Sequence, residues 1–471
     1  ARAFAEASAP GNTASRAPNV FGIGTKPTRS FSGQRAAMAA STPWSPWANA
    51  TISTEKPRAS RPSAWAWMKV SEGLGNRDTR KETGGAGMGG ARKHAQRALS
   101  PAPKRPAPSR VETQGERDYL RFMRILHLIA GAKQGGAEHH MMENVLALAE
   151  AGFAQHVVTR NQAPYRLARF KEAGVPLTLA SFSKMWRKHT EAAVGAAIAQ
   201  FKPDVVHHWM GRAGLFAQPA WIPRNLAWHG GYYKLERFKN CGWHAAVTSD
   251  IARSIVERGA PKERAVTLHN YASLEPDGPL DRAKFDTPKE APLVLALSRL
   301  HVKKGIDTLL QALTEMPGVY AWIAGEGPLE AKLKAMSARL GLASRVRWLG
   351  WRTDRAALLA ACNVVAFPSR YEPFGNVTIE AWAAGRPIVV ADAAGPAATV
   401  TAEVDALMVP KDDVAALRQA LARVIADKTL AAKLVEGGRA AYQAGYTKAA
   451  FVRNALALYS RIDEAARAEG K

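Results

Sequence analysis

The sequence predicts an α/β protein with two domains, each a parallel sheet with helices on both faces. From residue 123 onwards, short β-branched runs alternate with helical apolar patterns, which is typical of such a sheet. A proline-rich, charged stretch, Leu274–Pro292, interrupts the alternation and is interpreted as a linker between two series. The length of 471 residues is sufficient for two or three domains.

Residues 1–122 show neither helical nor alternating apolar periodicity, and we expect them to form a disordered low-complexity extension. Residues 1–120 contain 19 Lys and Arg, 8 Asp and Glu, and 11 of the 28 prolines. Such a segment buries too little apolar surface to offset the entropy lost on ordering. A natural start at Met123 is our preferred explanation, and a targeting segment or an interaction tail are the alternatives. The glycine pattern Gly85–Gly90 has no strand before it, so we expect flexible sequence there rather than a dinucleotide site.

The first alternating series, residues 123–285, is expected to form an N-terminal Rossmann-like acceptor domain. Its first helix, 137–151, carries Met141, Val145 and Leu148 on one face, and a second helix is expected near 191–201. The strands expected in this domain are 125–129, 155–159, 175–180, 204–208, 226–229, 245–248 and 265–268.

The second series, residues 286–471, is expected to form a C-terminal Rossmann-like donor domain. Its expected strands are 293–297, 320–324, 345–349, 364–367 and 387–391. Asp412 or Asp413 caps a following amphipathic helix, and a last helix, 448–468, is expected to pack back on the N-terminal domain. Ligands of such sheets bind at the carboxyl ends of the strands, so we expect the site in a cleft between the two domains.

The stretch after strand 364–367 is the most informative about chemistry. Glu372 lies in the loop at the carboxyl end of the strand, Gly375 and Asn376 open a helix, and Glu380 lies one turn inside it. Free N–H groups at a helix start bind phosphate, and a carboxylate nearby accepts hydrogen bonds from sugar hydroxyls. Each glutamate alone is better explained as a surface or helix-capping residue.

This stretch resembles the signature of the retaining group 1 (family 4) nucleotide-sugar glycosyltransferases, which have the GT-B fold of two facing Rossmann-like domains. Their signature is two glutamates separated by seven residues and followed by Gly-x-Pro, and Glu372, Glu380 and Gly385–Pro387 reproduce it. The resemblance extends over residues 123–463. It implies transfer of a sugar from a nucleoside diphosphate donor to an acceptor hydroxyl, with the anomeric configuration retained.

The resemblance also implies roles for individual residues. Arg299 and Lys304 match the pair of cations that holds the donor diphosphate, as developing charge there requires. Glu380 would hold the ribose and Glu372 would orient the sugar. His229 matches the active-site histidine, with a buried core histidine as the alternative. The catalytic set is therefore His229, Glu372, Arg299 and Lys304, and the donor-binding set is Gly135, Gly136, Glu326, Gly350, Phe374, Gly375, Asn376 and Glu380.

We expect neither a metal ion nor a cofactor, because fixed cations would take the place of a metal at the leaving diphosphate. The sequence has no Asp-x-Asp and no His-Glu-x-x-His, and its two cysteines, Cys241 and Cys362, lie far apart. By the same resemblance, the nucleotide sugar would be a substrate and not a cofactor.

The expected acceptor is a glycan or lipid-linked glycan, in lipopolysaccharide or other cell-surface glycan synthesis. Basic and aromatic residues of the first domain form either a solvated face or a surface for anionic lipid headgroups. These residues are Tyr165, Arg166, Arg169, Phe170, Lys171, Lys184, Trp186, Arg187, Lys188, Tyr232, Tyr233, Lys234, Arg237, Phe238 and Lys239. We therefore expect a cytoplasmic protein, peripheral at the inner face of the cytoplasmic membrane.

Other classes of function explain the sequence less well. A net charge of +25 would suit nucleic-acid binding, but no recognition motif accompanies it, and we expect no specific nucleic-acid partner. No run of about 18 apolar residues is present to span a bilayer. A non-catalytic nucleotide-sugar-binding protein and a sugar-nucleotide epimerase on the same scaffold remain the alternatives, and the reaction products distinguish them from a transferase.

Overall fold

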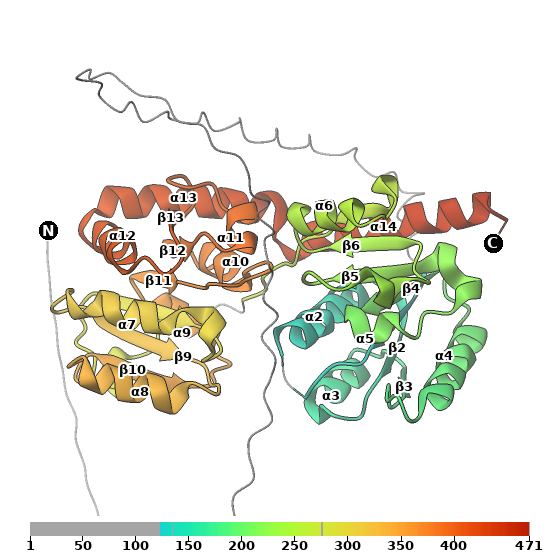
Figure 1. Ribbon diagram of the computed structural model, residues 1–471, viewed down its shortest axis with the longest axis horizontal. Helices are drawn as coiled ribbons and strands as arrows, with labels where there is room; N and C mark the ends of the chain where they lie inside the picture. The colour runs from blue at the N-terminus through green and yellow to red at the C-terminus, as the bar shows by residue number, and fades with distance from the viewer. Residues whose placement is uncertain (1–122, 134, 275–276, 471) are drawn as a thin grey trace, which may run out of the picture. The chain divides into compact units, whose positions relative to one another are not determined.

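The computed structural model describes residues 123–133, 135–274 and 277–470 (Figure 1). The expected disordered extension, residues 1–122, and its Gly85–Gly90 stretch lie outside the described residues. The strands of the described residues form two parallel sheets, of seven and six strands. The predicted two-sheet α/β class is confirmed.

The first sheet has the strand order β3-β2-β1-β4-β5-β6-β7, with every neighbouring pair parallel. Its strands are β1 (Arg124–Ile129), β2 (Ala154–Thr159), β3 (Leu177–Leu179), β4 (Val205–Trp209), β5 (Asn225–His229), β6 (Trp243–Ala246) and β7 (Ala265–Thr267). The inner strands β4, β5 and β6 are buried along their whole length, as expected where helices cover both faces of a parallel sheet.

Helices or 3₁₀ turns connect consecutive strands, as in βαβ units, and Figure 1 shows the helices around the first sheet. They are α2 (Gly136–Glu150), α3 (Pro164–Glu172), α4 (Arg187–Phe201), α5 (Met210–Gly214) and α6 (Ser249–Glu257), with 3₁₀ turns η1 (Pro219–Arg224), η2 (Leu235–Phe238) and η3 (Lys262–Arg264). Helix α3 was not expected from the sequence; Pro164 starts it and Arg166 and Phe170 are its buried residues.

The second sheet has the order β10-β9-β8-β11-β12-β13 and is also parallel. Its strands are β8 (Leu293–Leu297), β9 (Tyr320–Ala324), β10 (Val346–Gly350), β11 (Val364–Phe367), β12 (Ile388–Ala391) and β13 (Leu407–Val409). Its helices are α7 (Ile306–Thr314), α8 (Glu330–Arg339), α9 (Arg355–Ala361), α10 (Asn376–Ala383), α11 (Ala394–Thr399), α12 (Val414–Ala426) and α13 (Lys428–Gly445), with 3₁₀ turns η4 (Arg282–Phe285) and η5 (Val302–Lys304).

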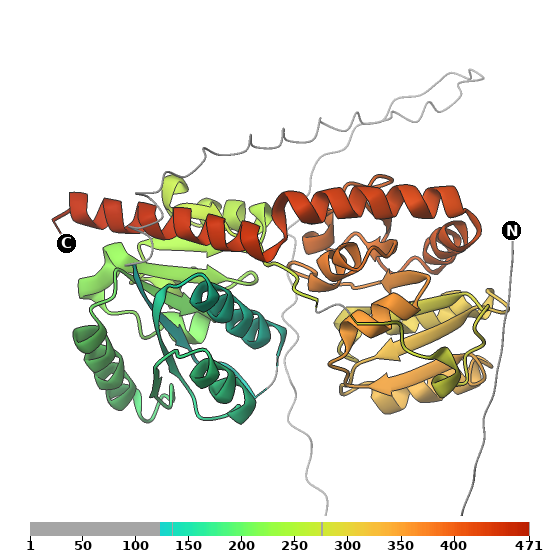
Figure 2. The ribbon, with the colours of Figure 1, turned by 180° about the vertical axis from the view of Figure 1, so that it is seen from behind.

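The last helix, α14 (Lys448–Ala468), contacts α2, β4 and η1 of the first half and also follows and contacts α13 (Figure 2). The hydroxyl of Thr447 accepts a hydrogen bond from the Ala450 N–H and caps the helix. Buried Tyr459 lies 3.0 Å from the His207 ring, and Asp463 accepts a bond from Arg224 at 2.7 Å. The boundary at residues 285/286 remains a prediction. No helix among the described residues is long and apolar enough to cross a membrane.

Candidate active site

A cavity of about 450 Å³ lies at the carboxyl ends of strands from both sheets. The first sheet contributes residues from the loop after β1 and from α2 and α3. The second contributes residues that follow β8, β9, β10 and β11. The residues that line the cavity are Gly135, Gly136, His139, Met142, Tyr165, Leu297, Ser298, Arg299, Ala324, Gly325, Trp351, Arg352, Thr353, Arg355, Asn376, Val377 and Glu380.

Glu380 is placed in this cavity by helix α10. The helix begins at Asn376 because Gly375 adopts a left-handed conformation, φ 99°, that only glycine adopts readily. The Asn376 side chain is fixed by Asn270, whose amide donates to its oxygen at 2.8 Å. Burial raises the pKa of the Glu380 carboxyl, and the ion pair with Arg355 opposes that rise. A buried, paired carboxylate at this position is ready to accept hydrogen bonds from hydroxyl groups.

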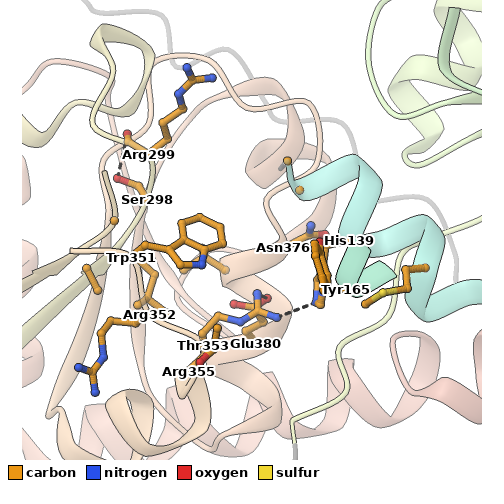
Figure 3. Close-up of a pocket in the computed structure, with 17 residues that line it drawn as sticks. His139, Tyr165, Ser298, Arg299, Trp351, Arg352, Thr353, Arg355, Asn376 and Glu380 are labelled. Atoms are coloured by element: carbon orange, nitrogen blue, oxygen red, sulfur yellow. Dashed lines mark hydrogen bonds and ion pairs between the residues drawn. The ribbon is translucent and has the colours of Figure 1, made fainter. Parts of the chain in front are cut away.

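Arg355 links the two sheets through hydrogen bonds. Its guanidinium binds Glu380 and also donates to the Nε2 atom of His139 at 3.2 Å (Figure 3). Burial, and then the charges of Arg355 and Arg166, lower the pKa of His139 to about 4, so its ring is neutral near pH 7 and can accept this bond. The result is a Glu380–Arg355–His139 chain running from α10 through α9 to α2.

Glu372 and Lys304 form an ion pair beside the cavity. Lys304 ends the 3₁₀ turn η5, and the following Gly305 has φ 63° and packs so tightly that a Cβ would come 2.0 Å from the Pro368 carbonyl oxygen. The side chains of Lys304 and Glu372 are largely buried, and the Glu372 carbonyl accepts from the Gly395 N–H at 2.7 Å. Glycine is therefore required where η5 meets the loop after β11, and this contact fixes the ion pair.

Arg299 lines the cavity and has a free guanidinium. It forms no ion pair or side-chain hydrogen bond within the described part of the chain. Figure 3 shows its side chain directed away from the Glu380–Arg355 pair, along the opposite end of the cavity. An unpaired cation at a strand end is suited to an anionic group such as a diphosphate.

Gly135 and Gly136 contribute the lining from the first sheet. A Cβ at Gly135 would lie 2.2 Å from the Oε2 atom of Glu138, so the loop fits closely over that side chain. Glu138 is buried and accepts from the Ala132 N–H at 2.8 Å, while Arg166 donates to the Ala132 carbonyl at 3.0 Å. These contacts hold the glycine loop in place from below.

The loop after β10 borders the other side of the cavity. The Gly350 carbonyl accepts from the Gly325 N–H at 2.7 Å, and the Glu326 carboxylate accepts from the Trp351 N–H at 3.3 Å. Trp351 lines the cavity with 58% of its surface exposed. A large exposed aromatic ring in this cavity offers a stacking surface for a planar base.

Seven of the predicted residues do not line the cavity, namely His229, Lys304, Glu326, Gly350, Glu372, Phe374 and Gly375. His229 ends β5, is fully buried and lies 3.0 Å from the Nδ1 atom of His244. Burial, then the neighbouring His244 and Arg258, hold the pKa of His229 well below its usual range. Phe374 is buried against the His269 and Tyr446 rings, with centroids 6.3 and 6.2 Å away.

Of the predicted residues, Gly135, Gly136, Arg299, Asn376 and Glu380 line one cavity. Sequence reasoning did not identify His139, Tyr165, Trp351, Arg352, Thr353 and Arg355 as lining residues. Trp351, Arg352, Thr353 and Arg355 follow a predicted strand, and this position was the available signal. His139 had no such signal, because its role depends on Arg355 from the other sheet.

Comparisons with known proteins show the family of the chain. The model of the family "Glycosyl transferases group 1" matches residues 277–441. The chain is 31% identical over 351 residues to the lipopolysaccharide core biosynthesis glycosyltransferase LpsD of Rhizobium meliloti, covering 72% of this chain and 98% of that protein. It is 32% identical over 319 residues to LpsE of the same organism, covering 67% of this chain and 93% of that protein.

Solved structures share the fold at lower identity. Anabaena HepE in complex with UDP and glucose superposes with a TM-score of 0.61 at 21% identity, over 72% of this chain and 99% of that one. The lipopolysaccharide outer core galactosyltransferase WaaB superposes with a TM-score of 0.57 at 18% identity, over 70% and 98%. The two-sheet architecture is thus that of the GT-B fold, and the chain is a nucleotide-sugar glycosyltransferase belonging to the group 1 glycosyl transferase family.

Proposed function

We propose that this enzyme transfers a hexose from a UDP-sugar to a hydroxyl of a lipid-linked glycan such as a lipopolysaccharide core, with retention and without a metal ion. The observation that carries the proposal is the shared cavity. It is lined from one sheet by Arg299, Asn376 and Glu380 and from the other by Gly135 and Gly136. A nucleotide sugar needs such a combination of hydroxyl acceptors, cations and close backbone approach.

The donor would lie with its ribose hydroxyls on Glu380 and its base toward Trp351. The diphosphate would then run toward Arg299, Lys304 and the N-terminal end of α10. The first turn of helix α10 has free backbone N–H groups and no acidic side chain, which favours a bound anion. Glu372, paired with Lys304, would orient the sugar hydroxyls.

Transfer breaks the bond between the anomeric carbon and the diphosphate oxygen and forms a bond to the acceptor oxygen on the same face. The proton of the acceptor hydroxyl passes to the departing phosphate. Glu380, the one carboxylate among the described lining residues, is paired with Arg355, and Glu372 is paired with Lys304, so we assign neither as a nucleophile. Arg299 and Lys304 stabilise the charge on the departing diphosphate, which is why we propose that no metal is needed.

His229 would act through position rather than by direct contact. It is buried at the end of β5, immediately before Gly230 and Gly231. A Cβ at Gly231 would lie 3.4 Å from Pro373, the neighbour of Glu372, so this turn packs on the sugar-orienting loop. Holding that turn is a positioning role.

The relatives support the choice of donor and acceptor. LpsD and LpsE act in lipopolysaccharide core biosynthesis by name, and HepE was solved with UDP, with UDP and glucose, and with UDP-glucose. Assembly of a lipid-linked core from a UDP-sugar would place the enzyme in the cytoplasm, at the inner face of the cytoplasmic membrane.

A product assay with a matched pair of variants tests the proposal. The enzyme, E380Q and the exposed control E436Q are incubated with UDP-hexoses and a lipopolysaccharide core acceptor, with and without EDTA. We expect an α-linked product from an α-linked donor, unaffected by EDTA, and about 100-fold less of it from E380Q, as charge-assisted hydrogen bonds to the donor are lost. Release of UDP with free or epimerised sugar and no glycosylated acceptor would contradict the proposal.

A further inference from the structure

Exposed apolar side chains in the first-sheet half gather at one edge of the sheet. The large ones are Tyr165, Leu179, Met185, Trp186, Leu215, Ile222 and Tyr232. All but Ile222 lie at the carboxyl end of a strand or within the seven residues that follow it. The strands are parallel, so these positions share the edge that also carries Gly135 and Gly136 of the donor cavity.

The segment Lys184–His189, which follows β3 and includes the first three residues of α4, is the most exposed part of this edge. All six of its residues are exposed, Met185 by 85% and Trp186 by 61%. Met and Trp side chains are seldom left in water to this extent without a partner to cover them.

Buried residues on both sides of this segment, Phe182 and Thr190, hold it in a defined shape. Phe182 has φ 51°, is buried and packs edge-on against Phe216 at 5.2 Å between ring centroids. Its backbone N–H donates to the hydroxyl of buried Thr190 at 3.2 Å. The two ends of the segment are therefore fixed, and Met185 and Trp186 are presented outward between them.

Cations flank the two apolar side chains along the chain. Lys184 and Lys188 form no ion pair with any described residue, whereas Arg187 pairs with Glu191 at 2.7 Å. Arg187 also donates to the Leu215 carbonyl at 3.1 Å, which brings exposed Leu215 next to the segment. Exposed apolar side chains flanked by unpaired lysines complement a surface that is apolar inside and anionic outside.

We propose that the 184–189 segment docks on an anionic lipid bilayer, with Met185 and Trp186 entering the headgroup region and Lys184 and Lys188 binding lipid phosphates. Tryptophan is favoured at this depth, and lysine charges are attracted by the negative surface. Docking there would turn the cavity edge of the first sheet toward the membrane. The use of this arrangement for a lipid-linked acceptor rests on the proposed function, but the docking itself does not.

Site-specific labelling tests insertion directly. The native thiols, Cys241 and Cys362, are buried and have raised pKa values, so a polarity-sensitive fluorophore can be attached selectively to an introduced M185C. With the full chain and vesicles of phosphatidylglycerol and phosphatidylcholine, the label at 185 should shift to shorter wavelength. A label in the control V404C, at an exposed valine of the second half, should not shift. An unshifted label at 185 overturns the proposal.

Sedimentation with the same vesicles separates insertion from simple charge attraction. M185S/W186S keeps every charge of the chain, including those of residues 1–122, and should lose vesicle binding about tenfold or more at high salt. I222S/V404S, which removes exposed apolar side chains elsewhere, should bind as the parent does. K184A/K188A should weaken binding at low salt more than K428A/K433A does.

The outcomes keep docking and transfer distinguishable. Parent-like vesicle binding by M185S/W186S would overturn docking while leaving transfer to a detergent-solubilised acceptor intact. Vesicle-free dimerisation that M185S/W186S abolishes would assign the segment to a second copy of the chain and also overturn it. Normal insertion without any transfer would leave docking standing and refute the proposed function instead.

Discussion

At the scale of single residues, the site depends on charges held in fixed pairs. Glu380 and Arg355 pair inside the cavity, Lys304 and Glu372 pair beside it, and Arg299 has no partner among the described residues. Burial limits the movement of the paired groups and strengthens their effect on a bound diphosphate. The two cations therefore differ in their partners. Lys304 is neutralised by Glu372 within the fold, whereas Arg299 is available to bind an anion.

Neighbouring lysines provide a test of this difference. K304M should lower kcat about 100-fold, because it removes a cation at the leaving group and leaves Glu372 unpaired. K303M is the matched control: Lys303 packs over the Tyr371 ring at 4.2 Å and should change kcat little. Steady-state kinetics with saturating donor measure both, and equal losses in the two variants would show that the position of the charge does not matter.

A second residue-scale prediction concerns pH. Burial raises the pKa of Glu380, and the Arg355 charge counteracts that rise. Donor binding needs the ionised carboxylate, so it should weaken as the pH falls through this pKa. In R355M the opposing charge is gone, so the loss of donor affinity on acidification should begin at a higher pH. Measurement of UDP affinity between pH 4.5 and 8 checks this prediction. The same pH dependence in the parent and in R355M would show that Arg355 does not control the ionisation of Glu380.

At the scale of elements, most of the fold was readable from the sequence. Strands 293–297, 320–324 and 364–367 and the last helix, 448–468, have the predicted bounds, because each is a continuous apolar or amphipathic run with clear ends. Strand β13, only Leu407–Val409, was missed since three residues give no periodicity. Helix α3 was missed because its buried face contains Arg166, whose carbonyl partners at Ala132 and Lys133 are distant in sequence.

The site was readable only in part, for the same reason. The Glu372–Glu380 spacing and the Arg299–Lys304 pair are local patterns, so the sequence predicts them directly. The Arg355–His139 hydrogen bond joins residues from two sheets; only its position after a predicted strand marks Arg355, and nothing local marks His139. His229 was predicted from the end of its strand, but strand ends alone do not distinguish a cavity residue from one buried against His244.

At the scale of the whole molecule, buried histidines make the fold sensitive to acid. Burial lowers the pKa of His127, His208 and His244 to about 4 and that of His140 to about 3, from an ordinary value of 6.5. The unfolded chain therefore binds more protons than the folded chain between pH 6.5 and these values. The stability that the neutral rings contribute is complete above pH 6.5 and declines as the pH falls toward 4.

The predicted size of this effect is large. At pH 5, each histidine whose folded pKa is about 4 should cost about 2 kcal/mol of unfolding free energy relative to pH 8. Urea unfolding at pH 8, 6.5 and 5 measures it. A free energy of unfolding that stays constant over this range would mean that these rings are not held neutral in the fold.

The central claim is that one cavity, lined from both sheets, binds the nucleotide sugar. A crystal structure of the enzyme with a non-hydrolysable UDP-sugar tests it most directly. The account predicts ribose hydroxyls about 3 Å from the Glu380 carboxylate and the diphosphate between Arg299, Lys304 and the start of α10. A nucleotide bound elsewhere, or bound here with its diphosphate facing neither cation, would contradict it.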